Sequence, residues 1–250
     1  VGYLSQDYAL FPNMTVLQNI LCGAGDRKKA SEYVKRFFLE GKEQLYPAQL
    51  SGGQKQRTAM ARMLAGEPGI LMLDEPFTAL DNYLKMQLER ELMKVMEDYG
   101  KTVLFVSHDR NEAYRMTDRI AVMEDGQILD VQPKEELFQN PSSLAATLLT
   151  GCKNVSELWT EPDGRYAATD WGIRLSAPPE EGNYKYAAFR AHYFQVVPTM
   201  EATNVLKCHI LRVIEDTFST VVLFCNGNRT GEHASEVLTY ELPKEEWQSL

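Results

Sequence analysis

The sequence has little positive charge, and it contains no long apolar run. Its 250 residues include 26 lysines and arginines against 35 aspartates and glutamates, which gives a formal net charge of -9. This balance argues against nucleic acid or an anionic membrane surface as the main partner. No apolar run reaches the roughly 18 residues of a membrane-spanning helix. The first six residues also lack the charged start and the apolar core of a signal peptide.

Paired cysteines and an initiator methionine are absent as well. The four cysteines are scattered and form no C-x-x-C pair. We interpret them as buried thiols of a protein in a reducing cytosol, the alternatives being disulfides or metal ligands. Because the chain begins on an apolar, strand-like stretch without methionine, we expect its amino-terminal part to be missing. The composition that remains, 44% hydrophobic and 24% charged residues, is ordinary for one large or two modest globular domains.

One stretch, Gln49–Asp81, combines the features of an anion site. Its sequence LSGGQ places Ser51 at the N-cap of a predicted helix, where the side-chain oxygen meets free backbone N–H groups. The positive end of the helix dipole lies at the same point. Gly52 and Gly53 follow, and they allow the backbone to approach an anion closely. The turn is therefore a predicted phosphate site.

The same stretch also ends a buried strand on two adjacent acids. The apolar run Ile70–Leu73 leads into Asp74 and Glu75 at the carboxyl edge, where open α/β sheets bind ligands. An aspartate there can hold Mg²⁺ through water, and the neighbouring glutamate can accept a proton from an attacking water. In the alternative interpretation, one acid caps the next helix and the other is solvated. His108 ends the neighbouring strand Val103–Val106 and could donate to the same phosphate, although a lone histidine is more often structural.

Strands and helices alternate through residues 1–149, which predicts an α/β domain with parallel strands and right-handed crossovers. Residues 15–65 are expected to form a mainly helical insert within it. The expected helices are Val16–Leu21, Asp26–Leu39, Gly52–Ala65, the long helix after Asp81 that Gly100 closes, Arg110–Met116, Pro133–Phe138 and Ser142–Leu149.

The composition changes at Thr150-Gly151, where short strand-like runs separated by turns begin. They predict a second domain, residues 150–250, built as a small β-barrel or sandwich. The expected strands are Glu157–Thr160, Tyr166–Thr169, Ile173–Leu175, Tyr186–Phe189, Val205–Ile214, Thr220–Phe224 and Val237–Leu242.

Four motifs in one order, LSGGQKQR, ILMLDEP, TALD and VSHD, resemble the nucleotide-binding subunit of ATP-binding-cassette (ABC) transporters. The resemblance covers residues 1 to about 149 and implies a P-loop NTPase fold that uses ATP and Mg²⁺. It implies catalytic roles for Glu75, His108 and Gln6, ATP contacts for Ser51, Gly52, Gly53, Gln54 and Asp81, and Mg²⁺ binding by Asp74 with Gln6.

In that family the signature Ser51 and Gly53 touch ATP held mainly by the other subunit, so the resemblance also implies a head-to-tail dimer. One motif of the family is absent: the chain contains no G-x-x-x-x-G-K-[ST] phosphate loop. Since every later motif is intact, we interpret this absence as truncation of the P-loop domain. The polypeptide as it stands is then not expected to hydrolyse ATP.

The loop before Ile20 and the β domain are similar to those of importer subunits. This likeness implies that transmembrane permease subunits dock near Gln6–Ile20, at the cytoplasmic face of the cell membrane, and that a periplasmic or lipoprotein substrate-binding protein takes part indirectly. The C-terminal domain then resembles an oligonucleotide-binding-like (OB-like), transport-associated regulatory domain. Arg190 and His192 are conceivable oxyanion donors in it, or structural residues.

Segments such as SHDRNEAYRMTDR and FRAHYF resemble molybdate importers in particular. The expected cargo is therefore molybdate, with sulfate, iron, polyamine or sugar as alternatives. Two other function classes stay open. One is an ABC ATPase of DNA repair or translation, against which the acidic charge and the β domain weigh. The other is a non-catalytic regulatory fragment, which the missing phosphate loop literally implies.

Overall fold

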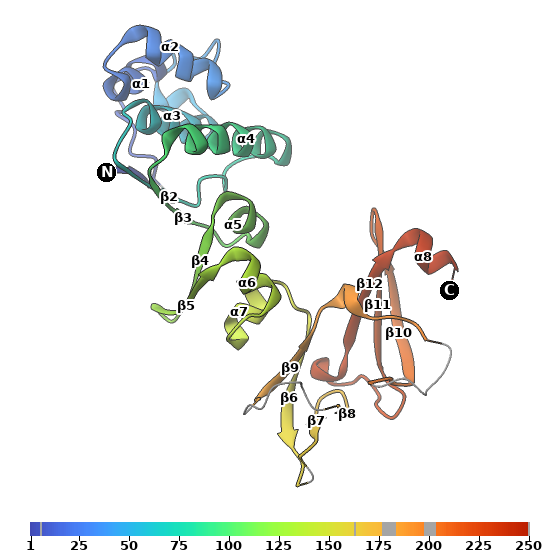
Figure 1. Cartoon of the computed structure of the whole chain (residues 1–250). Helices are drawn as coiled ribbons and strands as arrows, with labels where there is room; N and C mark the ends of the chain where they lie inside the picture. The colour runs from blue at the N-terminus through green and yellow to red at the C-terminus, as the bar shows by residue number, and fades with distance from the viewer. Residues whose placement is uncertain (6, 163, 177–183, 198–203, 250) are drawn as a thin grey trace. The chain divides into compact units, whose positions relative to one another are not determined.

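A computed structural model describes the chain except for residues 6, 163, 177–183, 198–203 and 250 (Figure 1). The chain divides into two compact units, Val1–Ile120 and Ala121–Leu250. The expected domain boundary near Thr150 is a sequence-based division, and it remains a prediction. Gln6, expected to take part in catalysis, lies outside the described residues.

Three parallel strands form the sheet of the first unit. They are β1 (Gly2–Leu4), β2 (Ile70–Asp74) and β3 (Thr102–Val106), in the order β1-β2-β3. Asp74 pairs with Val106 in register, so β2 and β3 end at the same edge of the sheet. Only one face of these strands is covered: Leu71 and Leu73 are buried, whereas Ile70, Leu104 and Val106 are 43%, 52% and 48% exposed. The expectation of buried strands is therefore wrong for the second face.

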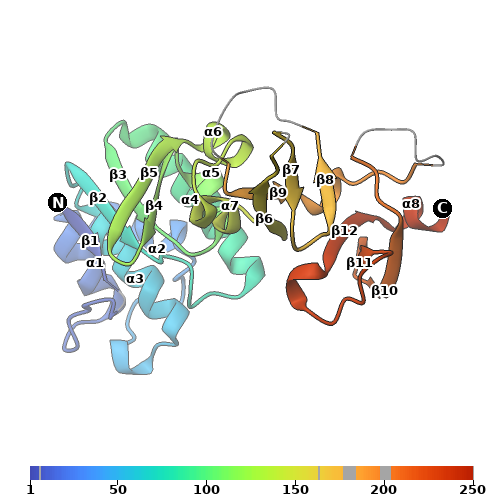
Figure 2. The same ribbon diagram turned by 90° about the horizontal axis from the view of Figure 1, so that it is seen from below.

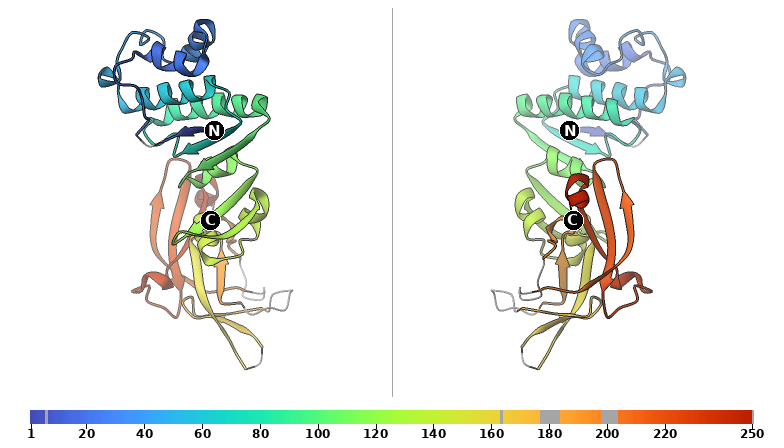
Figure 3. Two further views of the ribbon diagram at one scale, coloured as in Figure 1. Left: turned by 90° about the vertical axis from the view of Figure 1, so that its left-hand side faces the viewer. Right: turned by 90° about the vertical axis from the view of Figure 1, so that its right-hand side faces the viewer.

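Five α-helices accompany this sheet in the described part of the first unit. They are α1 (Val16–Ala24), α2 (Arg27–Arg36), α3 (Gly52–Ala65), α4 (Asn82–Tyr99) and α5 (Arg110–Met116), with a 3₁₀ turn at Pro47–Gln49. Figure 3 shows α3 and α4 running side by side over the strands, with α1 and α2 beyond them.

The helix ends follow the capping residues in the sequence. Thr15 and Gln18 form a capping box at α1, and Ser51 and Gln54 form another at α3. Gly100 ends α4 in the left-handed conformation, at φ 57°. The buried apolar faces of these helices meet those of the strands in one core, which includes Ile20, Phe37, Met60, Leu64, Leu71, Leu73, Phe77, Leu88 and Leu92.

The second unit begins with a hairpin and two short helices. Strand β4 (Arg119–Glu124) crosses the division between the units and pairs with β5 (Gln127–Pro133). Helices α6 (Lys134–Gln139) and α7 (Leu144–Leu149) follow.

Two antiparallel sheets make up the rest of the second unit (Figure 2). One has the order β8-β7-β6-β9 and the other the order β10-β11-β12. Their strands are β6 (Asn154–Thr160), β7 (Tyr166–Ala168), β8 (Ile173–Leu175), β9 (Tyr186–Phe189), β10 (Cys208–Glu215), β11 (Ser219–Asn226) and β12 (Leu238–Pro243). Both sheets contribute to a second core, formed by Ala168, Trp171, Val222, Phe224, Leu238, Tyr240 and Leu242. The expected β domain is therefore present.

Short helical pieces complete the second unit. The helix α8 (Lys244–Ser249), which the sequence reading did not predict, follows β12, and 3₁₀ turns lie at Ala191–Tyr193 and Ala234–Glu236.

Candidate functional site

Glu75 stands at the carboxyl end of β2 in an unusual backbone conformation. Its φ is 46°, in the left-handed region that a non-glycine residue seldom adopts. Three groups hold it there. Its N–H donates to the carbonyl of Val106 at 2.9 Å, while its own carbonyl accepts from Gln56 Nε2 at 3.3 Å and Thr78 Oγ1 at 3.2 Å. Strained residues kept by such surroundings gather at functional sites.

The side chain of Glu75 meets His108. His108 Nδ1 lies 3.0 Å from Glu75 Oε1, and Thr78 Oγ1 donates to Glu75 Oε2 at 3.1 Å. The hydrogen bond from His108, followed by that from Thr78, lowers the pKa of Glu75. The same contact raises the pKa of His108. The structure thus brings together two residues that the sequence places 33 positions apart.

Asp74, the last residue of β2, precedes this pair. The hydroxyl of Tyr3 on β1 lies 3.5 Å from Asp74 Oδ2. Among the described residues no group of three or more His, Cys, Asp or Glu side chains could hold a metal ion. A single carboxylate still fits Mg²⁺, because this ion keeps much of its water and takes its remaining ligands from substrate phosphates.

The two signature glycines have different surroundings at the start of α3. A Cβ on Gly53 would lie 3.0 Å from the carbonyl oxygen of Ala79 and 3.0 Å from Leu80 Cδ2, so Gly53 is needed for packing. A Cβ on Gly52 would meet only Ala79 Cβ, at 3.8 Å. Packing therefore does not require a glycine at position 52. The exposed backbone of Gly52 fits the predicted phosphate contact better than that of Gly53 does.

Ser51, Gln54 and Asp81 already serve as caps. Gln54 N donates to Ser51 Oγ at 3.3 Å, while Ser51 N donates to Gln54 Oε1 at 2.9 Å. Asp81 Oδ1 accepts from Leu84 N at 3.0 Å and so begins α4. These contacts position the three residues, and their contact with ATP stays a prediction.

Sequence reading missed a polar network beside His108. Ser107 Oγ donates to Glu112 Oε2 at 2.5 Å, and Lys85 Nζ lies 3.0 Å from Asp109 Oδ2 and 2.5 Å from Glu112 Oε1. Glu112 is only 5% exposed, and such a buried acid requires partners. The sequence signal was slight: Lys85 stands one turn into a helix, where a lysine is usually solvated.

Asn19 and Arg62 organise the loop that precedes α1. Buried Asn19 accepts from Phe11 N at 2.9 Å and donates to the carbonyls of Phe11, Met14 and Thr15. Arg62 donates to the carbonyl of Ala9 at 2.8 Å, and its guanidinium lies over the Phe11 ring. Phe11 is 45% exposed, and the loop that carries it is fixed by these contacts with Asn19 and Arg62.

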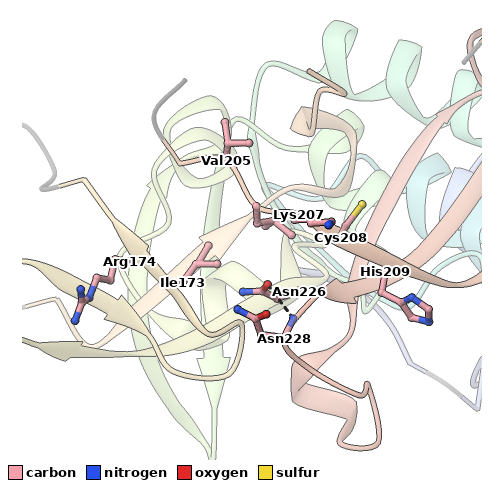
Figure 4. Close-up of a pocket in the computed structure, with 10 residues that line it drawn as sticks. Ile173, Arg174, Val205, Lys207, Cys208, His209, Asn226 and Asn228 are labelled. Carbon is pink, nitrogen blue, oxygen red and sulfur yellow. Dashed lines mark hydrogen bonds between the residues drawn. The ribbon is translucent and has the colours of Figure 1, made fainter. Parts of the chain in front are cut away.

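The second unit contains a cavity of about 610 Å³ between Ile173 and the start of β10 (Figure 4). Asn226 and Asn228 lie at its centre, while Arg174 and His209 point away from them. Arg174 Nε pairs instead with Glu161 at 3.1 Å. Arg174 and His209 therefore do not converge on the asparagines as the donors of an anion site would.

The two donors considered for the C-terminal domain have local contacts. Arg190 donates to the carbonyls of Thr150 and Phe138, and the ring of His192 packs edge-on against Tyr193. Arg190 is thus a structural residue. All four cysteines are free thiols, but only Cys152 and Cys225 are buried. The expectation of buried thiols is wrong for Cys22 and Cys208, which are exposed. No described helix has the length and apolarity to cross a membrane.

Comparison with known proteins assigns the class. The first 78 residues match the sequence model of the family described as ABC transporter. A dimeric structure of a bacterial ABC transporter cassette aligns with a TM-score of 0.50 at 36% identity, over 54% of this chain and 62% of that one. Residues 1–78 therefore belong to the ABC transporter family, and the first unit has the fold of an ABC ATPase cassette, as the motifs implied.

Some of the individual relatives are named for import. The sulfate/thiosulfate import ATP-binding protein CysA 2 of Rhizobium meliloti (strain 1021) is 37% identical over 79% of this chain and 57% of its own length. CysA of Bacillus cereus (strain ATCC 10987 / NRS 248) is 44% identical over 57% of this chain and 43% of its own length. The uncharacterized ABC transporter ATP-binding protein YdcT of Escherichia coli (strain K12) is 39% identical over 72% and 57%. The chain thus spans about half the length of these curated relatives.

Proposed function

We propose that this chain is part of the ATP-binding subunit of an ABC importer, in which ATP hydrolysis drives uptake of an oxyanion. The observation that carries the proposal is the 3.0 Å contact between Glu75 and His108 at the common carboxyl edge of β2 and β3. An acid held in a strained conformation beside an imidazole, next to a second acid, fits hydrolysis of the phosphoanhydride bond of ATP better than a structural role.

Each residue of the edge has a distinct task in this proposal. Glu75, whose ordinary pKa of 4.5 is lowered further by His108 and Thr78, is ionised at neutral pH, and its carboxylate is placed to accept a proton from water. His108, whose pKa is raised, orients Glu75 and can donate to a phosphate oxygen. Asp74 would hold Mg²⁺, which neutralises phosphate charge when it is bound. Gln6 is proposed to act on the same water and ion.

The signature turn is proposed to serve the ATP of a second subunit in a head-to-tail dimer. Gly52 is open and lies in the first turn of a 14-residue helix, where free N–H groups attract phosphate. Ser51, Gly53, Gln54 and Asp81 complete the contact in this proposal. The solved cassette structure that aligns with this chain is itself dimeric, which supports the same arrangement here.

The partners proposed for the chain are permease subunits at the cytoplasmic face of the membrane, which dock on the loop held by Asn19 and Arg62. A substrate-binding protein acts with them indirectly. The named relatives import sulfate or thiosulfate rather than molybdate, so they favour sulfate as the cargo. Sulfate and molybdate are both tetrahedral oxyanions of charge -2. Molybdate is therefore kept as the competing substrate in the test.

The hydrolytic proposal is tested with the full-length gene product in MgATP. We expect Glu75→Gln to keep ATP binding and to lower turnover about 100-fold or more, because a positioned base is lost. The control is Glu91→Gln, which changes an acid of α4 that pairs with Lys94 and Arg36 and lies outside the proposed site. Absence of turnover in the wild-type protein would refute hydrolysis, whereas near-normal turnover of Glu75→Gln would remove Glu75 from its role.

The cargo is tested by uptake. The full-length protein is reconstituted with its permease and substrate-binding protein, and ATP-dependent uptake of radiolabelled sulfate is measured with molybdate as competitor. We expect sulfate to enter and excess molybdate to compete only weakly. Preferred uptake of molybdate would reverse the order of the two oxyanions, and uptake of neither would refute the oxyanion class.

A further inference from the structure

We propose that Lys85 is a positioning residue for His108, because it ties α4 to both sides of the segment that carries this histidine. The inference rests on the proposed function, in which turnover of ATP needs His108. It adds a residue that lies outside the four sequence motifs.

Hydrogen bonds and ion pairs fix the segment on both sides of His108. We call this network of Lys85, Ser107, Asp109 and Glu112 the clamp. Ser107 Oγ accepts from Asp109 N at 3.0 Å and donates to Glu112 Oε2, so the residues on either side of His108 are bonded to each other. Asp109 in turn caps α5 by accepting from Asn111 N at 2.8 Å. Lys85 Nζ closes the clamp from α4 by contacting both Asp109 and Glu112.

His108 depends on this clamp because little else holds it. Its side chain is 74% exposed, so packing does not define its orientation. Its described side-chain contact is the one with Glu75. A residue in this situation is aimed chiefly by its backbone, and that backbone is fixed by Ser107 and Asp109.

Lys85 also removes a charge conflict. Asp109 and Glu112 both direct a carboxylate oxygen at its ammonium group, and the side chain of Glu112 is 7% exposed. Burial lowers the pKa of Lys85, but the hydrogen bonds to Glu112 and Asp109 raise it overall, so the lysine is charged. Without it, two acids of the first turn of α5 would face each other with no cation between them, and breaking such a partly buried pair is costly.

The position of Lys85 connects His108 to the start of α4. Lys85 N donates to the carbonyl of Asp81 at 2.8 Å, and Asp81 is the N-cap of that helix. The first turn of α4 therefore holds the proposed ATP-contacting Asp81 at one end and the clamp on His108 at the other. A shift of that turn is transmitted to the histidine through one side chain.

The experiment compares ATP turnover by variants of the full-length gene product. We expect Lys85→Met to lower kcat about tenfold while KM for ATP stays within about twofold, because a misplaced group slows the chemical step without removing the binding contacts. Lys85→Arg keeps the charge and should restore most of the rate. Lys94→Met, which changes an exposed lysine on the same helix, is the matched control and should behave as wild type.

A double variant separates positioning from general damage. In the His108→Ala background, Lys85→Met should lower kcat no further, because both changes remove the same aimed side chain. A further tenfold loss there, or a Lys85→Met enzyme as fast as wild type while His108→Ala is slow, would overturn the inference. A His108→Ala enzyme with normal kcat would overturn it too.

Failure of the proposed function has a different signature, since wild-type protein would then not turn over ATP or Glu75→Gln would turn over normally. If Lys85→Met does not fold, Lys85→Met combined with Glu112→Gln removes the uncompensated buried charge. That double variant should fold and still have a lowered kcat, because Asp109 lacks its ion pair with Lys85. A folded double variant with full kcat would refute the positioning role.

Discussion

At the scale of single residues, the two signature glycines, Gly52 and Gly53, are glycine for different physical reasons. Gly53 is excluded from carrying a side chain by the carbonyl of Ala79 and by Leu80. A Cβ on Gly52 would make only an ordinary contact, 3.8 Å from Ala79 Cβ, and the helix position of Gly52 leaves N–H groups unpaired. The sequence expectation treated both residues as places where backbone approaches an anion.

Substitution by alanine should separate these two causes. We expect Gly53→Ala to lower the free energy of unfolding by about 1–3 kcal/mol through overpacking. Gly52→Ala should leave unfolding nearly unchanged but weaken ATP-dependent dimerisation, since its methyl group would stand where phosphate is proposed to bind. Urea unfolding and size-exclusion chromatography with ATP measure the two effects. Equal destabilisation by both variants would contradict the distinction.

The Glu75–His108 contact predicts a pH dependence with a definite sign. His108 has a pKa raised above its ordinary 6.5, so the stability that it contributes is present below that value and is lost as pH rises through the raised pKa. Glu75 has a pKa lowered from 4.5, so its contribution is present above that value and is lost as pH falls through the lowered pKa. Both contributions are therefore present together between about pH 4.5 and 6.5.

The measurement is an NMR titration of the His108 ring. We expect its midpoint to lie above 6.5 in the wild type and to return toward 6.5 in Glu75→Gln, because the carboxylate that favours the charged imidazole is gone. A His108 midpoint unaffected by Glu75→Gln would contradict the contact.

Sequence reading found the site residues that local rules define and missed those that long-range contacts define. Ser51 was identifiable because capping depends on neighbours within one turn. The left-handed conformation of Glu75 was not, because it depends on Gln56, 19 residues away, and on Val106. Lys85 was missed for the same reason, since its partner Asp109 lies 24 residues away.

At the scale of elements, the loop before α1 is held by one buried amide. Asn19 is fully buried and bonds to Phe11, Met14 and Thr15. We expect Asn19→Ala to cost about 1–3 kcal/mol, because buried backbone groups lose their partner. Hydrogen exchange of the Phe11 amide should accelerate accordingly.

The loop variant has a natural control in Asn13, an exposed asparagine of the same loop. Asn13→Ala should leave the exchange of Phe11 unchanged. If the loop is the permease-docking surface, Asn19→Ala should also weaken assembly with the permease more than Asn13→Ala does. Unchanged exchange in Asn19→Ala would show that Arg62 alone orders the loop.

Most element boundaries followed from patterns that are local in the chain. The expected helix Gly52–Ala65 agrees with α3 at both ends, because a capping box begins it and the Glu67-Pro68-Gly69 run follows its end. The strand expected from Val205 begins later, at Cys208, where pairing with Asn226 starts. Helix α8 was missed because a six-residue helix has too little apolar periodicity to be recognised.

At the scale of the whole molecule, the described residues form two hydrophobic cores that share no residue. The first includes Leu92 of α4, and the second includes Leu238 of β12. A unit with its own core can unfold on its own, so we expect two transitions in urea. All three tryptophans, Trp159, Trp171 and Trp247, lie in the second unit, whereas α1–α5 lie in the first.

Tryptophan fluorescence therefore follows the second unit, and circular dichroism at 222 nm follows mainly the helices of the first. We expect Leu92→Ala to shift the dichroism transition and Leu238→Ala to shift the fluorescence transition, each by about 2–5 kcal/mol for a buried cavity. Each variant is the control for the other, since both remove the same three carbons from sites that are at most 1% exposed. If either variant shifted both transitions equally, the two units would unfold as one cooperative body. The prediction that each core unfolds independently would then be wrong.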